Sequence, residues 1–243
     1  MKTLVIMLVY FASAMLGSMA GGAALITIPT LIFAGISPHT AIGTNKVGSV
    51  GIGAGAAHGY REHHELGKKI IFSSMLLAAA GSIIGSLVIL SINEIIVKKI
   101  IGVIMIIVVA LLFIDKGSGI KTLTKRINRK FLVAFSFASG VYSGFYGAGM
   151  GIINRFVLSK FFYMTMISSS ALSVVFSLAS GIVSFLVFAY FGKIEYSLIV
   201  PVLLSSLLGS YAGARYSIKL GNEKLKIVLA VVSAAMAVQL LFF

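Results

Sequence analysis

The chain of 243 residues contains no cysteine, no tryptophan and only six acidic residues. Without cysteine it can form no disulfide, no thiolate metal site and no cysteine nucleophile. Charged residues make up 11% of the sequence, whereas soluble domains contain about 25%. This low charge excludes an ordinary soluble protein. It also excludes a disordered one, which would combine high charge with low hydrophobicity.

Hydrophobic residues are abundant instead: they make up 59% of the chain, and the mean hydropathy is +1.08. A spanning helix needs about 20 apolar residues, so the chain can hold roughly six to nine spans. The sequence therefore predicts an all-α, multi-pass protein in the lipid bilayer of the cell membrane, most simply a prokaryotic plasma membrane. The net charge is +14, but the basic residues lie between apolar runs, where they meet lipid headgroups rather than nucleic acid.

Motifs of familiar enzymes are absent. The chain has no G-x-S-x-G, no H-E-x-x-H and no G-x-x-x-x-G-K-[ST] sequence, so it lacks a nucleophile elbow, a zincin site and a P-loop. We therefore expect no enzyme, no catalytic residue and no cofactor.

Two groups of polar residues have simple structural explanations. The first group comprises His58, Glu62, His63, His64 and Glu65. These side chains could bind a metal, but a solvated, basic connection between two helices explains them equally well. We therefore expect no metal site. The second group comprises Ser168, Ser169, Ser170, Ser180 and Ser184. These serines could bind a ligand, but serine hydroxyls often hydrogen-bond to carbonyl groups of their own helix, and we favour that role.

The chain divides into two similar halves, residues 1–115 and 131–243, joined by a basic linker at 116–130. Similar short stretches follow the same order in both halves: Phe11–Ala14 and Phe137–Gly140, Gly17–Gly22 and Ser143–Gly151, Leu66–Lys68 and Phe191–Lys193, Gly81–Gly85 and Gly209–Gly213. The shared order predicts two structural repeats. The alternative is that small residues simply recur in membrane helices, where they allow close packing.

The first apolar run of each half is longer than a membrane requires. Residues 3–35 would form a helix of roughly 50 Å, against a hydrocarbon core of about 30 Å. Glycines lie in the middle of this run and of the run at 131–162. We therefore expect each run to break at its glycines and to return, as a re-entrant hairpin, to the side from which it entered. The alternative is eight simple crossings.

The distribution of basic residues favours the re-entrant arrangement. With two hairpins, 14 basic residues lie on one side of the membrane and 4 on the other; with eight simple crossings the numbers are 11 and 7. Cytoplasmic loops carry the excess of lysine and arginine. The sequence thus predicts a cytoplasmic linker, both termini outside, and three full spans in each half. An odd number of spans inverts one repeat relative to the other.

The two glycine-rich breaks are the leading candidates for a substrate site. Irregular backbone at membrane depth must be buried in protein or line a cavity. A half-helix that begins after a break directs N–H groups and a positive dipole end toward the midplane, which favours anions. The candidates are Gly21, Gly22, Gly147, Gly149 and Gly151. The alternative is that these glycines serve only close packing.

Two cations, Lys46 and Arg155, fall within the apolar runs, with Thr44, Asn45 and Asn154 beside them. Charges at membrane depth are costly and usually functional, although long side chains can also reach an interface. The acids all lie at joints or run ends: Glu62, Glu65, Glu94, Asp115, Glu195 and Glu223. An anionic ligand could therefore neutralise the two cations, and we expect all five residues at the substrate site. The absence of deep carboxylates argues against a cation carrier.

Three stretches together resemble the TauE/SafE family of sulfite and organic-anion exporters: Gly22–Pro29, Gly35–Thr44 and Ser143–Gly151. The family has a glycine-rich turn, a proline, then a second proline with Ala-x-Gly-Thr, and it repeats the turn in its second half. This chain departs from that pattern at Ala23 and Ala24, and at residues 167–170. The resemblance implies a secondary transporter that moves sulfite, sulfonates or related organosulfur anions by alternating access.

Other functions remain open at this point. The chain could be the permease subunit of a larger complex with a separate ATPase, or a carrier for another small anion. An intramembrane enzyme would need a polar catalytic set that the sequence does not provide. The sequence leaves the oligomeric state and the direction of transport undetermined.

Overall fold

The computed structural model describes residues 2–59, 68–114 and 129–217. Within these ranges the chain forms α-helices, one short 3-10 helix and turns, with no strand. The elements are α1 (Lys2–Ala20), α2 (Ala24–Phe33), α3 (Pro38–Gly59), α4 (Lys68–Ser91), α5 (Glu94–Ile114), α6 (Arg129–Phe145), α7 (Met150–Phe161), α8 (Met166–Tyr190), η1 (Tyr196–Leu198) and α9 (Ile199–Ser217). The predicted all-helical class is confirmed. The linker at 116–130 lies almost wholly outside the described residues.

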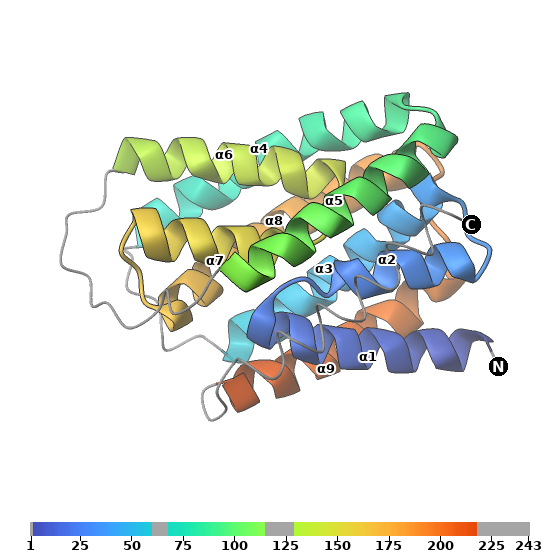
Figure 1. Cartoon of the computed structure of the whole chain (residues 1–243), viewed down its shortest axis with the longest axis horizontal. Coiled ribbons are helices and arrows are strands. Elements are labelled where there is room, and N and C mark those ends of the chain that lie inside the picture. The colour runs from blue at the N-terminus through green and yellow to red at the C-terminus, as the bar shows by residue number, and fades with distance from the viewer. Residues whose placement is uncertain (1, 60–67, 115–128, 218–243) are drawn as a thin grey trace.

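The helices form two hairpins that open in opposite directions. In Figure 1, α1 runs from the N-terminus at the right toward the left, and α2 runs back toward the right. The second hairpin begins on the left with α6, and α7 returns to the left. The long helices follow the same pattern, because α3 runs toward the left and α8 toward the right.

The helix pairs that pack together have matching positions in the two halves. Helix α1 lies against α9, and α6 lies against α4. In the centre α3 packs on α8, while α3 also contacts α9 and α8 contacts α4. The largest buried cluster lies along α1, α2, α3, α5 and the end of α8, and includes Tyr10, Leu25, Ile42, Met105 and Phe188. This packing places the turns of both hairpins inside the bundle.

The outer surface is apolar, as a lipid environment requires. Helix α4, helix α8, and η1 together with α9 contain stretches that are long and apolar enough to cross a membrane: Lys69–Ser91, Ser168–Tyr190 and Tyr196–Tyr216. Large apolar side chains on these helices face outward, with Phe72, Leu186 and Val200 each about 60% exposed. Polar side chains are turned inward instead. The fold is that of a membrane protein.

Glycines let neighbouring helices approach until their backbones touch. A Cβ atom added at Gly85 of α4 would overlap the carbonyl oxygen of Val141 and lie 2.6 Å from the Phe145 nitrogen, both on α6. On the matching pair, Gly209 and Gly213 of α9 meet the backbone of α1 in the same way. Small residues at such contacts are typical of membrane helices.

We expect Gly85→Val to destabilise the α4–α6 pair, because the valine side chain has no space against the α6 backbone. Overpacking of this kind costs about 1–3 kcal/mol, and more where backbone must move. Thermal unfolding of the purified protein in detergent measures the loss. The matched control is Ala80→Val, at an exposed position of the same helix. Equal melting temperatures of the two variants would contradict the close packing.

A polar cluster holds the beginning of α3 in place. His39 lies between two acceptors: its Nδ1 is 3.2 Å from Glu94 Oε1, and its Nε2 is 3.0 Å from the Ile89 carbonyl oxygen. The ring thus links the first turn of α3 to the end of α4 and the start of α5. Burial raises the pKa of Glu94, but hydrogen bonds from Ser37 and Lys193 and the charges of Lys193 and His39 outweigh it and hold that pKa below its ordinary value. The cluster fixes the helix that carries Thr44, Asn45 and Lys46.

Candidate functional site

Both long apolar runs are interrupted at their glycines. Gly21 and Gly22, between α1 and α2, have φ angles of +83°. Gly147 and Gly149, between α6 and α7, have φ angles of +83° and +76°. Residues with a Cβ atom rarely adopt this left-handed region, whereas glycine does so at no steric cost. The predicted breaks in both runs are therefore confirmed, and glycines occupy the positions that need a positive φ angle.

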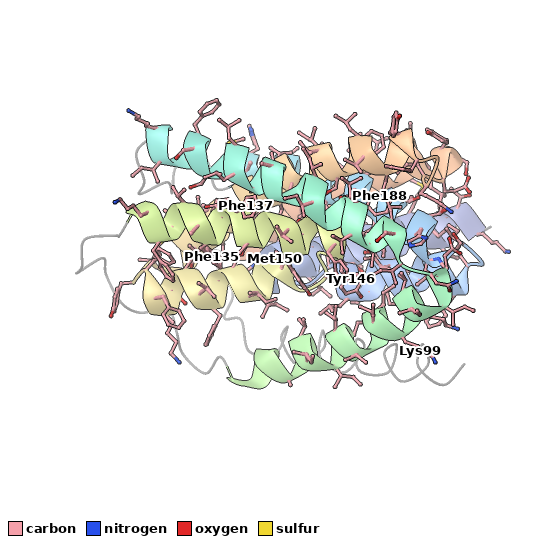
Figure 2. The ribbon with its side chains drawn as sticks, turned by 90° about the horizontal axis from the view of Figure 1, so that it is seen from above. Lys99, Phe135, Phe137, Tyr146, Met150 and Phe188 are labelled. Carbon is pink, nitrogen blue, oxygen red and sulfur yellow. The ribbon has the colours of Figure 1, made fainter. Side chains whose placement is uncertain are left out.

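The two breaks touch each other in the middle of the protein. A Cβ atom added at Gly21 would lie 2.7 Å from the backbone nitrogen of Ile152, and one added at Gly151 would lie 3.0 Å from the Gly21 Cα. Figure 2 shows Tyr146 and Met150, which flank the second break, midway along the bundle. The structure thus brings together segments that are more than 120 residues apart in the sequence.

A cavity of about 70 Å³ lies where the breaks meet. One water requires about 10–15 Å³ on this scale, so the cavity has room for several waters or one small polyatomic ion. It is lined by both breaks and by parts of α1, α3, α6, α7 and α8. Its polar side chains are Ser18, Ser49, Ser143, Arg155, Ser170, Ser173 and Ser177.

The N-termini of α2 and α7 both face this cavity. Ala23 and Ala24 line it at the start of α2, and Gly149 and Met150 line it at the start of α7. In the described structure neither helix has a side-chain cap at its N-terminus. Helix N-termini carry unpaired N–H groups and a partial positive charge, and they commonly bind anions. Both ends add positive potential to the cavity.

Arg155 adds a full positive charge to the cavity lining. Its side chain is 6% exposed, and its Nη2 donates hydrogen bonds to the carbonyl oxygens of Ser18 at 3.1 Å and Gly17 at 3.4 Å. Lys46 is even more deeply buried, at 2% exposure, but does not line the cavity. Its Nζ donates to the carbonyl oxygens of Ser143 and Tyr146, the latter at 3.2 Å.

Comparison with known proteins agrees with this architecture. The sequence profile of the family described as "Sulfite exporter TauE/SafE" matches residues 6–240. The chain belongs to the TauE/SafE family. It is therefore a membrane transporter.

Several relatives extend over almost the whole TauE/SafE chain. "Probable membrane transporter protein ORF9" of Sinorhizobium sp is 26% identical over 232 residues, which cover 95% of this chain and 89% of the relative. A "Probable membrane transporter protein" of Haemophilus influenzae is 25% identical, with 96% and 91% covered. "Probable membrane transporter protein YfcA" of Escherichia coli K12 is 23% identical, with 98% and 89% covered. No solved structure matches significantly.

Two asparagines hold the hairpins of this TauE/SafE protein to the central helices. Asn45 Oδ1 of α3 accepts hydrogen bonds from Tyr10 of α1 at 3.1 Å and from Thr27 of α2 at 2.6 Å. Asn154 of α7 accepts one from Ser139 of α6 at 3.0 Å and donates one to Ser173 of α8 at 3.2 Å. Each asparagine thus joins both arms of a hairpin to a long helix.

The ten predicted site residues divide into two groups in the structure. Six line the cavity: Gly21, Gly22, Gly147, Gly149, Gly151 and Arg155. Four lie outside its lining, with their polar atoms bonded to protein: Thr44, Asn45, Lys46 and Asn154. The hydroxyl of Thr44 accepts from the backbone nitrogen of Glu195 at 2.9 Å. Contact of these ten residues with a substrate stays a prediction.

Three serines line the cavity from one face of α8: Ser170, Ser173 and Ser177. The sequence analysis named Ser170 but favoured a bond to its own helix, and it missed Ser173 and Ser177. Their spacing of three and four residues is the signal that could have found them. The favoured back-bonding role holds for Ser169 and Ser180, which donate to carbonyl oxygens four residues earlier. It is wrong for Ser184, whose buried hydroxyl makes no hydrogen bond in the described structure. Four members of the possible metal-binding group, residues 62–65, lie outside the described residues. Among the residues that are described, no group of three side chains could hold a metal ion.

We expect Asn45→Ala to destabilise the protein, because the hydroxyls of Tyr10 and Thr27 lose their shared acceptor in a buried place. Stranding buried donors costs about 1–3 kcal/mol. Thermal unfolding of the purified protein should show a smaller loss for Tyr10→Phe, which removes one of the two bonds. Tyr196→Phe, at a 60% exposed position, is the control. An effect of Asn45→Ala no larger than that control would disprove the role of Asn45.

Proposed function

We propose that the protein is a secondary transporter that carries a small anion, such as sulfite, a sulfonate or a related organosulfur anion, across the cell membrane. The observation that carries this proposal is the cavity between the two breaks, where the N-termini of α2 and α7 and the side chain of Arg155 converge. All three contribute positive potential at one place. The family's name supports sulfite as the first anion to test.

The chemistry of the lining supports an oxyanion as the substrate. Six serines contribute hydroxyl groups that can donate to anion oxygens. Glycines at both breaks leave the backbone N–H groups within reach of a ligand. Among the described residues no carboxylate lines the cavity, so nothing there favours a cation. In a site with little water, these interactions are stronger than at a surface.

We further propose that the two halves are inverted repeats with re-entrant first hairpins, and that they alternate in opening the cavity to each side. The opposite directions of the two hairpins in Figure 1 support this arrangement, as do the matching helix pairs. Inverted repeats with half-helices that meet at a central site are a common plan of secondary transporters. Rocking of one half against the other would then expose the site alternately.

This arrangement places both ends of the chain outside the cell and the linker at 116–130 in the cytoplasm, as the 14-to-4 distribution of basic residues predicts. Reporter fusions at residue 243 and within the linker measure the location of each. We expect activity of a periplasmic reporter at the C-terminus and of a cytoplasmic reporter in the linker. A cytoplasmic C-terminus would contradict the re-entrant hairpins and favour eight simple crossings.

Transport by the purified protein in liposomes tests the substrate and the site together. We expect sulfite uptake, and we expect Arg155→Gln to weaken its apparent affinity by about tenfold or more, because a charge-assisted hydrogen bond contributes about 1.5–3 kcal/mol. Arg155→Lys keeps the charge and should lose less. Arg215→Gln, at an exposed position, is the matched control.

Two results would contradict the proposal. Equal affinities in the wild type and Arg155→Gln would remove Arg155 from the site. Absence of uptake for sulfite, sulfonates and other small anions by the purified chain would favour a permease subunit that needs a partner ATPase.

A further inference from the structure

The breaks create a problem for the helices that precede them. The last four carbonyl groups of a helix have no partner within that helix. Helices α1 and α6 both end at the breaks, where Gly17, Ser18 and Ser143 line the cavity. In a largely apolar surrounding, a backbone carbonyl without a donor is strongly destabilising. The protein must therefore supply donors at both ends.

At the end of α6 the donor is Lys46. Its ammonium group hydrogen-bonds to the carbonyl oxygens of Ser143 and Tyr146, which immediately precede the second break. A Cβ atom added at Gly147 would lie 3.4 Å from Lys46 Nζ, so the ammonium group lies directly against the break. Lys46 belongs to α3 in the first half, whereas α6 begins the second half.

At the end of α1 the Gly17 carbonyl oxygen accepts from the Gly21 N–H at 2.7 Å, and Arg155 adds a side-chain donor. Its guanidinium hydrogen-bonds to the carbonyl oxygens of Gly17 and Ser18. Arg155 belongs to α7 in the second half, and α1 begins the first half. One carbonyl of each bonded pair is equivalent, because Gly17 lies four residues before Gly21 and Ser143 lies four residues before Gly147. Each half therefore caps the broken helix of the other.

We propose that Lys46 and Arg155 are positioning residues that form two reciprocal clasps, each holding the C-terminal end of the broken helix in the opposite half. This proposal rests on the proposed function in one respect, since it assigns the clasps a purpose at the anion site. Lys46 acts on that site through the backbone of residues 143–151 and not by contact with the anion. Arg155 both holds α1 and lines the cavity.

The clasps also have an electrostatic effect on the cavity. The C-terminal end of a helix carries about half a negative charge. The ends of α1 and α6 lie at the same two breaks as the N-termini of α2 and α7, so without compensation they would repel an anion there. The hydrogen bonds from Lys46 and Arg155 to these carbonyls reduce this repulsion. The positive ends of α2 and α7 are then left to act on the ligand.

Hydrogen–deuterium exchange of the purified full chain, without any anion, tests the reciprocal arrangement. We expect Lys46→Met to raise amide exchange at residues 143–151 in the second half by about tenfold or more, because a buried charge-assisted bond is lost. Arg155→Met should raise exchange at residues 17–24 in the first half. Lys99→Met, at an exposed position of α5 shown in Figure 2, should change neither segment.

A second variant separates a clasp from general misfolding. Lys46→Gln keeps a side-chain NH₂ donor without the ammonium charge and should give a smaller increase at the same residues 143–151. The proposal would be overturned if amide exchange rose equally in both halves in Lys46→Gln and in Arg155→Met. It would also be overturned by unchanged exchange at 143–151 combined with weaker sulfite binding by Lys46→Met, which would make Lys46 a direct ligand.

Sulfite binding by the same variants links the clasps to the site. We expect Lys46→Met to bind sulfite about tenfold or more weakly while its exchange rises at 143–151. In the crossed pattern of exchange, a variant in one half raises amide exchange at the break in the other half. If this pattern appears although the wild type binds no sulfite, the clasps are supported and the proposed substrate is wrong. If sulfite binds and the crossed pattern is missing, the clasps fail and the substrate stands.

Discussion

Two interruptions of the backbone inside an apolar bundle are the constraint on which the structure depends. Each one leaves carbonyl groups on one side and N–H groups on the other without helical partners. Several of the polar side chains in the centre serve this need. Lys46 and Arg155 bind the carbonyl ends, while Asn45 and Asn154 hold the arms of the hairpins to α3 and α8. The rest of the interior is occupied by serines, small residues and apolar side chains.

The two helix ends at each break differ in their side-chain hydrogen bonds, and this difference shapes the candidate site. Side chains satisfy the carbonyl ends of α1 and α6, whereas the N-termini of α2 and α7 carry no side-chain cap. Capping every end would have produced a neutral core. Leaving the N-terminal ends open at a cavity concentrates positive potential where a small anion can enter. The proposed preference for anions would thus follow from which backbone groups the protein leaves for the ligand.

Much of the fold could be predicted from the sequence, because run length and glycine position act locally. A run of 33 residues with Gly21 and Gly22 in its middle cannot remain one spanning helix without strain or tilt. The direction in which each helical side chain points depends on packing, which the sequence does not display. Thr44 therefore accepts from the backbone nitrogen of Glu195, just before η1, while Ser49, only five residues later, reaches the cavity. Lys46 shows the same limit: its partners are backbone carbonyls about 100 residues away, and no side-chain motif encodes them.

The reciprocal contacts make the site a property of both halves together. Neither half can provide the cavity alone, since each contributes one break and one cation that the other requires. A rocking motion of one half against the other would move Lys46 relative to the end of α6, and Arg155 relative to the end of α1. The donors and carbonyls that form the clasps would then have to separate or travel together. Because stranded carbonyls are so costly in an apolar interior, joint movement of each break with its clasp is the less costly path. The moving boundary would lie elsewhere, along the contacts between the long helices.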